Sequence, residues 1–211
     1  SKKPFFLFLS YTLPHAALQL PKDDSLLAHY IKLFNEKPVA VPEQWNGKGY
    51  EPQAYPRAAY AAMVTRLDMY VGEIKKETER LGISNNTLII FASDNGPHKE
   101  GGNDPEFFNS GGGLRGIKRD LYEGGIRTPF IAWWPGKVKA GTTSDYIGAF
   151  WDMLPTFAEL AGVIAPPAID GISIVPELLG RRGQKQHDHL YWEFHEQGGK
   201  QAVRLGNWKG I

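Results

Sequence analysis

TLIIFASDNG, residues 87–96, is the stretch that decides the fold class of this 211-residue chain. Its first six residues are apolar apart from Thr87, which predicts a buried strand at residues 87–92. This strand follows a long segment with helical periodicity at residues 56–81 and runs directly into small and polar residues. A helix, a buried strand and a polar strand end in this order are typical of an α/β domain.

The segment at residues 56–81 carries the clearest periodic signal in the chain. Its apolar residues recur at three- and four-residue intervals: Tyr60, Met63, Val64, Leu67, Val71 and Ile74. This spacing predicts an amphipathic helix of about seven turns. Pro56 suits the first turn of such a helix, and Gly82 suits the position just after its end.

Three further segments complete the predicted fold. The nearly all-apolar residues 4–11 and residues 130–134 are interpreted as buried strands, and residues 152–161 as a short helix. After about residue 180 the sequence becomes more polar. This change predicts a domain boundary between residues 1–180 and residues 181–211.

The composition limits the classes of partner. The chain has 24 basic and 23 acidic residues and a net charge of +1, so we expect no nucleic-acid and no membrane partner. No apolar run approaches the roughly 18 residues of a membrane span. The chain has no Cys, which removes disulfides, thiolate metal sites and cysteine nucleophiles.

Asp94 and Asn95 follow directly after the predicted strand at residues 87–92. Ligand sites in open α/β sheets gather at the C-terminal ends of strands, and the side-chain oxygens of Asp and Asn suit a hard cation such as calcium. A plain turn is the alternative, because Asn-Gly is a strong turn former. From these residues alone the turn is favoured.

Two basic side chains are further candidates. His15 follows the predicted strand at residues 4–11 and can act as an acid or base near neutral pH; a solvated or satisfied loop side chain is the alternative. Lys118 lies in a glycine-rich loop that can hold an anion with backbone N–H groups and an ammonium charge; a flexible surface loop is the alternative.

Two other patterns are interpreted as structural. Residues 111–116 match the G-x-G-x-x-G fingerprint, but no strand precedes them, so a dinucleotide site is rejected. His187, His189 and His195 are not spaced like a zinc finger or a helical His pair. Alternation along a strand is favoured over a metal site for these histidines.

Taken in order, these features resemble the type I sulfatases of the alkaline phosphatase superfamily. Residues 91–96 resemble the second metal-binding motif of that family, and Pro14-His15 resembles its Pro-His motif. Residues 114–129, which contain LRGIK and YEGGIRTP, are similar to its substrate-side motif and give the most specific match. Weaker matches to the elements that follow are DMLPT at 152–156, DGIS at 170–173 and RLGNWK at 204–209.

The resemblance covers nearly the whole chain and implies an α/β fold with a mostly parallel mixed sheet flanked by helices. By this resemblance, residues 1–180 are the C-terminal part of a sulfatase catalytic domain, and residues 181–211 begin a small C-terminal subdomain. The family habit implies a periplasmic, lysosomal or secreted protein. The implied substrate is a sulfated small molecule or glycan.

The resemblance also implies roles for five side chains. Asp94 and Asn95 would be calcium ligands, and Lys118 would bind a sulfate oxygen. His15 would contact the sulfate and protonate the leaving alcohol. His98, which follows the metal motif closely, would touch the substrate.

The chain departs from the family pattern at the nucleophile. Sulfatases use a formylglycine made from Cys or Ser in a Cys/Ser-x-Pro/Ala-x-Arg motif, and no residue of this chain fits it. The family's N-terminal Asp-Asp motif, which supplies further metal ligands, is not matched either. We therefore expect a fragment that is inactive alone and binds calcium weakly, with the formylglycine in a missing N-terminal half. A phosphoesterase or phosphonate hydrolase of the same superfamily, or a non-enzymatic glycan-binding module, are the alternatives.

Overall fold

The computed structural model describes residues 3–211, which form two compact units. The first unit comprises the residues up to Lys76 together with Pro97–Gly112, and the second comprises Glu77–Gly96 and Gly113–Ile211. Each unit is thus assembled from segments that are distant in the sequence.

Two helices dominate the first unit. These are α1 (Ser25–Phe34) and α2 (Pro56–Arg80), and the unit boundary falls inside α2. Leu18, Ala59 and Met63 form the buried core of this unit. The helix predicted from the apolar spacing is therefore confirmed, because α2 contributes two of these three core residues. A short 3-10 helix, η2 (Glu100–Gly102), belongs to the same unit.

A side-chain cap begins α1 and connects it to α2. Asp24 accepts hydrogen bonds from the N–H groups of Leu26 (2.8 Å) and Leu27 (3.1 Å), which have no partner inside the helix. Arg66 of α2 contacts the same carboxylate at 2.6 Å. Burial raises the pKa of Asp24, but the hydrogen bonds from Leu27, Arg66 and Leu26 outweigh it and lower that pKa.

Residues 4–11 do not form the buried strand that their composition predicted. Phe5, Phe6 and Phe8 are 64%, 70% and 78% exposed, and no strand of the described chain pairs with this segment. Apolar composition favours burial, but a strand also needs a neighbour that satisfies its N–H and C=O groups. The prediction of a strand is therefore wrong for the structure of residues 3–211.

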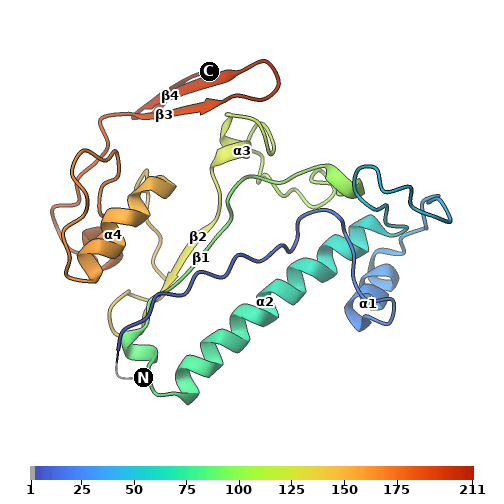
Figure 1. The fold of residues 1–211 in the computed structure, drawn as a ribbon, viewed down its shortest axis with the longest axis horizontal. Helices are drawn as coiled ribbons and strands as arrows, with labels where there is room; N and C mark the ends of the chain where they lie inside the picture. The colour runs from blue at the N-terminus through green and yellow to red at the C-terminus, as the bar shows by residue number, and fades with distance from the viewer. Residues whose placement is uncertain (1–2) are drawn as a thin grey trace. The chain divides into compact units, whose positions relative to one another are not determined.

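The second unit contains two small antiparallel sheets (Figure 1). β1 (Ile89–Ala92) pairs with β2 (Phe130–Trp133), which confirms the strands predicted at these positions. The other sheet has three strands: β3 (Leu190–Phe194), β4 (Lys200–Leu205) and β5 (Trp208–Gly210). The helical elements of this unit are η1 (Ser84–Asn86), α3 (Glu123–Ile126), η3 (Phe150–Asp152), α4 (Met153–Leu160) and α5 (Val175–Leu178).

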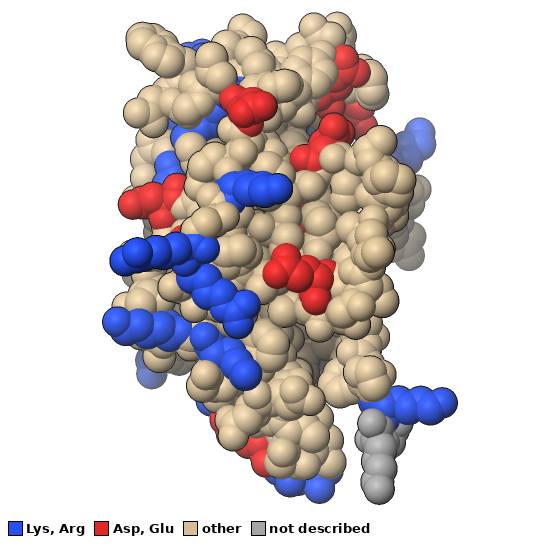
Figure 2. Space-filling model, turned by 90° about the vertical axis from the view of Figure 1, so that its left-hand side faces the viewer, with Lys and Arg blue, Asp and Glu red and all other residues tan. Residues whose placement is uncertain are grey.

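These elements confirm the α/β class. Every strand pair within residues 3–211 is antiparallel, so these strands alone do not form the mostly parallel sheet expected of the whole domain. None of the helices in this described range combines the length and the apolar character that a membrane crossing requires. On the face that Figure 2 draws, several Lys and Arg side chains lie together at the lower left, while Asp and Glu side chains are scattered over the rest of the face.

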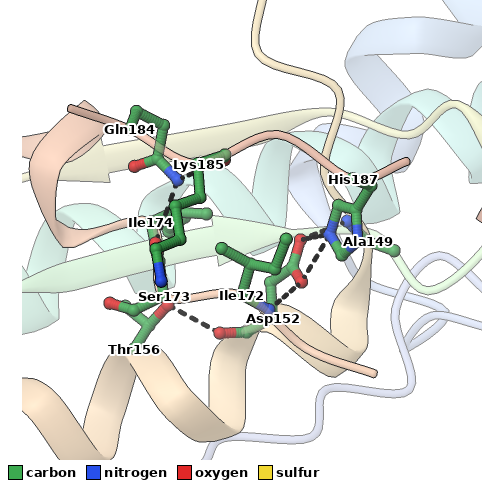
Figure 3. Close-up of polar contacts among 9 residues, drawn as sticks. All are labelled: Ala149, Asp152, Thr156, Ile172, Ser173, Ile174, Gln184, Lys185 and His187. Carbon is green, nitrogen blue, oxygen red and sulfur yellow. Dashed lines mark hydrogen bonds and ion pairs between the residues drawn. The ribbon is translucent and has the colours of Figure 1, made fainter. Parts of the chain in front are cut away.

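A buried carboxylate joins α4 to later segments of the second unit (Figure 3). Asp152 is fully buried and accepts hydrogen bonds from the N–H groups of Ala149 (2.9 Å) and Ile172 (2.8 Å). His187 Nε2 lies 2.9 Å from the same carboxylate. Thr156, also buried, donates its hydroxyl proton to the carbonyl oxygen of Asp152 (2.6 Å). The DMLPT motif therefore acts as a structural junction.

Candidate functional site

The turn after β1 exposes a carboxylate on a fixed backbone. Ser93 Oγ donates a hydrogen bond to the carbonyl oxygen of Asn95 (2.9 Å), and Gly96 N–H donates to the carbonyl oxygen of Gly125 (2.8 Å). Asn95 Nδ2 donates to Asp94 Oδ1 (3.0 Å). Asp94 itself is exposed, whereas Asn95 is half-buried. The turn is thus held by the residues around Asp94, and its carboxylate remains accessible.

Three glycines bring distant loops of the second unit into backbone contact. A Cβ atom on Gly96 would lie 1.8 Å from the carbonyl oxygen of Gly124, and one on Gly124 would lie 2.2 Å from that of Gly116. Both distances are far below the 3.0 Å limit for real Cβ atoms. The SDNG, LRGIK and YEGGIR motifs therefore form a single loop cluster, which we define as residues 93–96 and 114–127.

Lys118 lies in a tight turn within this loop cluster. Asp120 N–H donates to the carbonyl oxygen of Ile117 (2.9 Å), and Ile117 N–H donates to Asp120 Oδ2 (3.0 Å). Between them, Arg119 has a φ of +74°, which side-chain-bearing residues adopt uncommonly. The hydrogen bond from Ile117 N–H is the main reason that the pKa of Asp120 is lowered. Lys118 is half-buried at the centre of this turn.

His15 and His98 lie next to each other in the first unit. Their ring centroids are 5.7 Å apart, and the Tyr50 ring makes a T-shaped contact with His15 at the same centroid separation. His15 is exposed, and its Nδ1 lies 2.6 Å from the carbonyl oxygen of Ala16.

His98 is buried, in contrast to His15, and is 6% exposed. Its Nε2 lies 3.1 Å from the carbonyl oxygen of Pro14, and its Nδ1 lies 3.2 Å from Glu100 Oε2. Asn103 Nδ2 donates to the carbonyl oxygen of His98 (2.8 Å). Both ring nitrogens of His98 therefore contact groups of the first unit, and the ring connects the 98–103 segment to the residue before His15.

The structure places the predicted site residues in two groups. Asp94, Asn95 and Lys118 belong to the loop cluster of the second unit, and His15 and His98 form a pair in the first unit. The convergence of both groups on one rim of the sheet stays a prediction.

Sequence reasoning missed the acidic residues that support these groups. Glu100 contacts His98, and Asp120 closes the turn around Lys118. A short-range signal existed for both, because each acidic residue lies two positions from the residue it supports. Glu123, whose partners are described below, has no such local signal.

The donor set around Asp94 and Asn95 fits part of a calcium site. A carboxylate and an amide oxygen are ligands that calcium accepts, but calcium takes about six to eight oxygens. Within residues 3–211 no group of three or more His, Asp or Glu side chains is arranged to hold a metal. Calcium binding by Asp94 and Asn95 stays a prediction, and it would need further oxygen ligands.

The fold and the loop cluster define a class of protein. A structure of Ps i-CgsB in complex with k-i-k-neocarrahexaose superimposes with a TM-score of 0.73 at 30% identity, covering 99% of this chain and 41% of that chain. The phosphonate monoester hydrolase of Agrobacterium radiobacter, at 22% identity and a TM-score of 0.56, covers 74% of this chain and shares the fold alone. The chain thus has the alkaline phosphatase-like α/β fold of these proteins.

The sequence comparisons define the family. The family model described as Sulfatase matches residues 1–163. N-acetylgalactosamine-6-sulfatase of Mus musculus is 36% identical over 217 residues, which cover 99% of this chain and 34% of that protein. The chain belongs to the sulfatase family, and the resemblance read from its motifs is confirmed. It spans about a third of the length of the curated relatives that it matches.

Proposed function

We propose that this chain is the C-terminal part of an enzyme that hydrolyses sulfate esters. The observation that carries the proposal is the packing of the Asp94–Gly96 turn against Gly124 and Gly125, whose backbone also contacts the Lys118 turn. This arrangement supports a site in which metal ligands and an ammonium group serve one anion. Membership of the sulfatase family supports sulfate as that anion.

Two side chains of this chain have roles in the proposed reaction. The Lys118 ammonium binds a sulfate oxygen, because it offers up to three donors on a compact charge. His15 contacts the sulfate and gives a proton to the leaving alcohol, and its exposed ring supports access to a substrate. Sulfuryl transfer leaves negative charge on peripheral and leaving-group oxygens. Lys118 and His15 therefore stabilise different parts of that charge.

Two groups outside this chain complete the proposal. A calcium ion held by Asp94, Asn95 and further ligands would neutralise sulfate charge, and a formylglycine would supply the nucleophile. Around these two groups, Lys118 and His15 of this chain bind and orient the sulfate. Contact between His98 and the substrate remains part of the proposal, while its buried ring supports an additional role in holding the loop before His15.

We propose a sulfated sugar as the substrate class. Support comes from the names of similar proteins, which include an N-acetylgalactosamine-6-sulfatase and a structure in complex with a neocarrahexaose. A further neighbour, at 27% identity and a TM-score of 0.59, is in complex with D-glucosamine-2-N,6-O-disulfate as its substrate. A periplasmic, lysosomal or secreted location remains an expectation from the family.

The decisive experiment uses the complete protein that carries this chain. With calcium and a chromogenic aryl sulfate, we expect Lys118→Ala to lower kcat/KM by about 10²- to 10³-fold. Lys139→Ala, at an exposed lysine of the same unit, should leave kcat/KM unchanged. A higher kcat/KM for an aryl phosphonate ester than for the aryl sulfate would contradict the proposal and favour the phosphonate hydrolase alternative.

A further inference from the structure

The turn that carries Lys118 is supported from outside by the small C-terminal sheet. Lys200, the first residue of β4, places its Nζ 2.9 Å from the carbonyl oxygen of Arg119 and 3.3 Å from Asp120 Oδ1. Its third contact is with Gln197 Oε1 at 2.9 Å. An ammonium group has three N–H donors, so each donor of Lys200 has an acceptor within reach. Two of the three acceptors belong to the residues that directly follow Lys118.

Lys200 contacts the turn at its conformationally unfavourable residue, Arg119. Arg119 has a positive φ, which is unfavourable for a residue with a Cβ atom. The carbonyl oxygen of that residue accepts a hydrogen bond from Lys200. Asp120 uses one carboxylate oxygen to accept from Ile117 N–H and the other to contact Lys200. The Asp120 carboxylate therefore connects the inside of the turn to β4.

A second contact holds the other end of the same loop. Glu123, the first residue of α3, contacts Arg204 Nη1 at 3.0 Å and Lys209 Nζ at 2.8 Å. Arg204 and Lys209 are register partners in β4 and β5. Burial raises the pKa of Glu123, but the hydrogen bond from Lys209 and the surrounding positive charges outweigh it and lower that pKa.

The basic side chains that hold the loop share one face of the sheet. Lys200 and Arg204 are four residues apart in β4, and successive side chains of a strand alternate between faces, so both point to the same side. Ala202 lies between them on that side and is buried. The face of β4 with Lys200, Ala202 and Arg204 therefore packs toward the loop that contains Lys118, near α3 in Figure 1.

We propose that the C-terminal sheet is a positioning element of the sulfate site and that Lys200 is the residue through which it fixes Lys118. This inference rests on the proposed function, because it assumes that Lys118 binds the sulfate. Lys200 acts on Arg119 and Asp120, the two residues that directly follow Lys118 in the turn and set the direction of its side chain. Replacing Lys200 leaves the Lys118 ammonium group present but lets its side chain take other orientations.

The test is a double-mutant cycle in the complete enzyme with an aryl sulfate. We expect Lys200→Met to lower kcat/KM about tenfold, because a misplaced Lys118 ammonium group stabilises the transition state less well. In the Lys118→Ala background, Lys200→Met should change kcat/KM less than twofold, since its effect passes through Lys118. The matched control is Lys139→Met, which should have no effect in either background.

The outcomes separate the inference from the proposed function. A Lys200→Met effect of equal size in both backgrounds, or no effect of Lys200→Met beside a large effect of Lys118→Ala, would overturn the positioning role alone. Failure of Lys118→Ala to lower kcat/KM would overturn the proposed function first. If Lys200→Met does not fold, Lys200→Arg takes its place in the cycle. Arg keeps the charge but cannot place three donors on the same three acceptors, so we expect the same pattern with a smaller effect.

Discussion

The loop cluster of the second unit and the histidine pair of the first unit are held in place by different kinds of contact. In the loop cluster, glycines allow backbone to lie directly against backbone, and ion pairs to the C-terminal sheet add to this. In the histidine pair, contacts of side chains dominate: Glu100 Oε2 lies 3.2 Å from His98 Nδ1, and His98 Nε2 contacts the carbonyl oxygen of Pro14. Backbone packing has no room to adjust, whereas a side-chain contact can be lost gradually. The two regions should therefore respond differently to substitution.

Gly96→Ala should give the largest effect. The new Cβ atom would lie 1.8 Å from the Gly124 carbonyl oxygen, so the backbone of one loop must move. We expect the free energy of unfolding to fall by about 3 kcal/mol or more and sulfate ester hydrolysis to be lost. Chemical denaturation of the complete protein measures the first effect.

A helical glycine is the control for this substitution. Gly72 lies within α2 and has no atom within 4 Å of a built Cβ. Gly72→Ala should raise the free energy of unfolding by roughly 0.5 to 1 kcal/mol. Equal tolerance of alanine at both positions would contradict the backbone contact in the loop cluster.

Asp152→Ala should have the second-largest effect on the free energy of unfolding. The carboxylate is fully buried and contacts two backbone N–H groups and His187, so its removal leaves buried donors without partners. We expect a loss of about 3 kcal/mol in the free energy of unfolding. The exposed Asp145 of the same unit provides the control, and Asp145→Ala should change stability by less than about 0.5 kcal/mol. A loss below about 1 kcal/mol at Asp152 would show that water replaces the carboxylate.

The sequence revealed local patterns better than long-range pairs. The helix α2 and the strands β1 and β2 were predictable because their signals lie within each segment. Residues 4–11 carry an equally apolar pattern, yet a strand depends on a partner that composition does not specify.

In the candidate site, too, local motifs were readable from the sequence and long-range contacts were not. Asp94 and Lys118 could be proposed from the sequence because each family motif is contiguous. The contacts between Lys200 and Asp120, or between Arg204 and Glu123, join residues about 80 positions apart. No periodicity or spacing indicates which of 24 basic residues meets which acidic one. Only the folded backbone determines these pairs.

Glu100→Gln should have an intermediate effect, on activity and not on stability. The side chain is 18% exposed and contacts His98 Nδ1, so the substitution weakens the hold on the ring that contacts the Pro14 carbonyl. Because His15 follows Pro14, we expect kcat to fall about tenfold with little change in KM. Glu106→Gln, in the same 97–112 segment but 82% exposed, is the control and should leave both constants unchanged. A rise in KM at constant kcat would place Glu100 in substrate binding instead.

Glu123→Gln should have the smallest effect, and its pH dependence identifies the cause. The folded pKa of Glu123 is lowered from its ordinary value of 4.5, so the ion pairs contribute stability above that pH and lose it as the pH falls through the folded value. We expect the substitution to cost about 1 kcal/mol near neutral pH and progressively less as the pH falls below 4.5, measured by denaturation across this range. Other lowered carboxylates, such as Asp24, destabilise both variants equally in acid and cancel in the difference. Glu77, whose pKa is lowered by the hydrogen bond from Arg80 on the exposed surface of α2, is the comparison, and solvent screening should make the pH-dependent difference of Glu77→Gln smaller than that of Glu123→Gln. A difference at Glu123 that stays constant from neutral to acid pH would mean that its shape, and not its charge, holds the loop cluster against the C-terminal sheet.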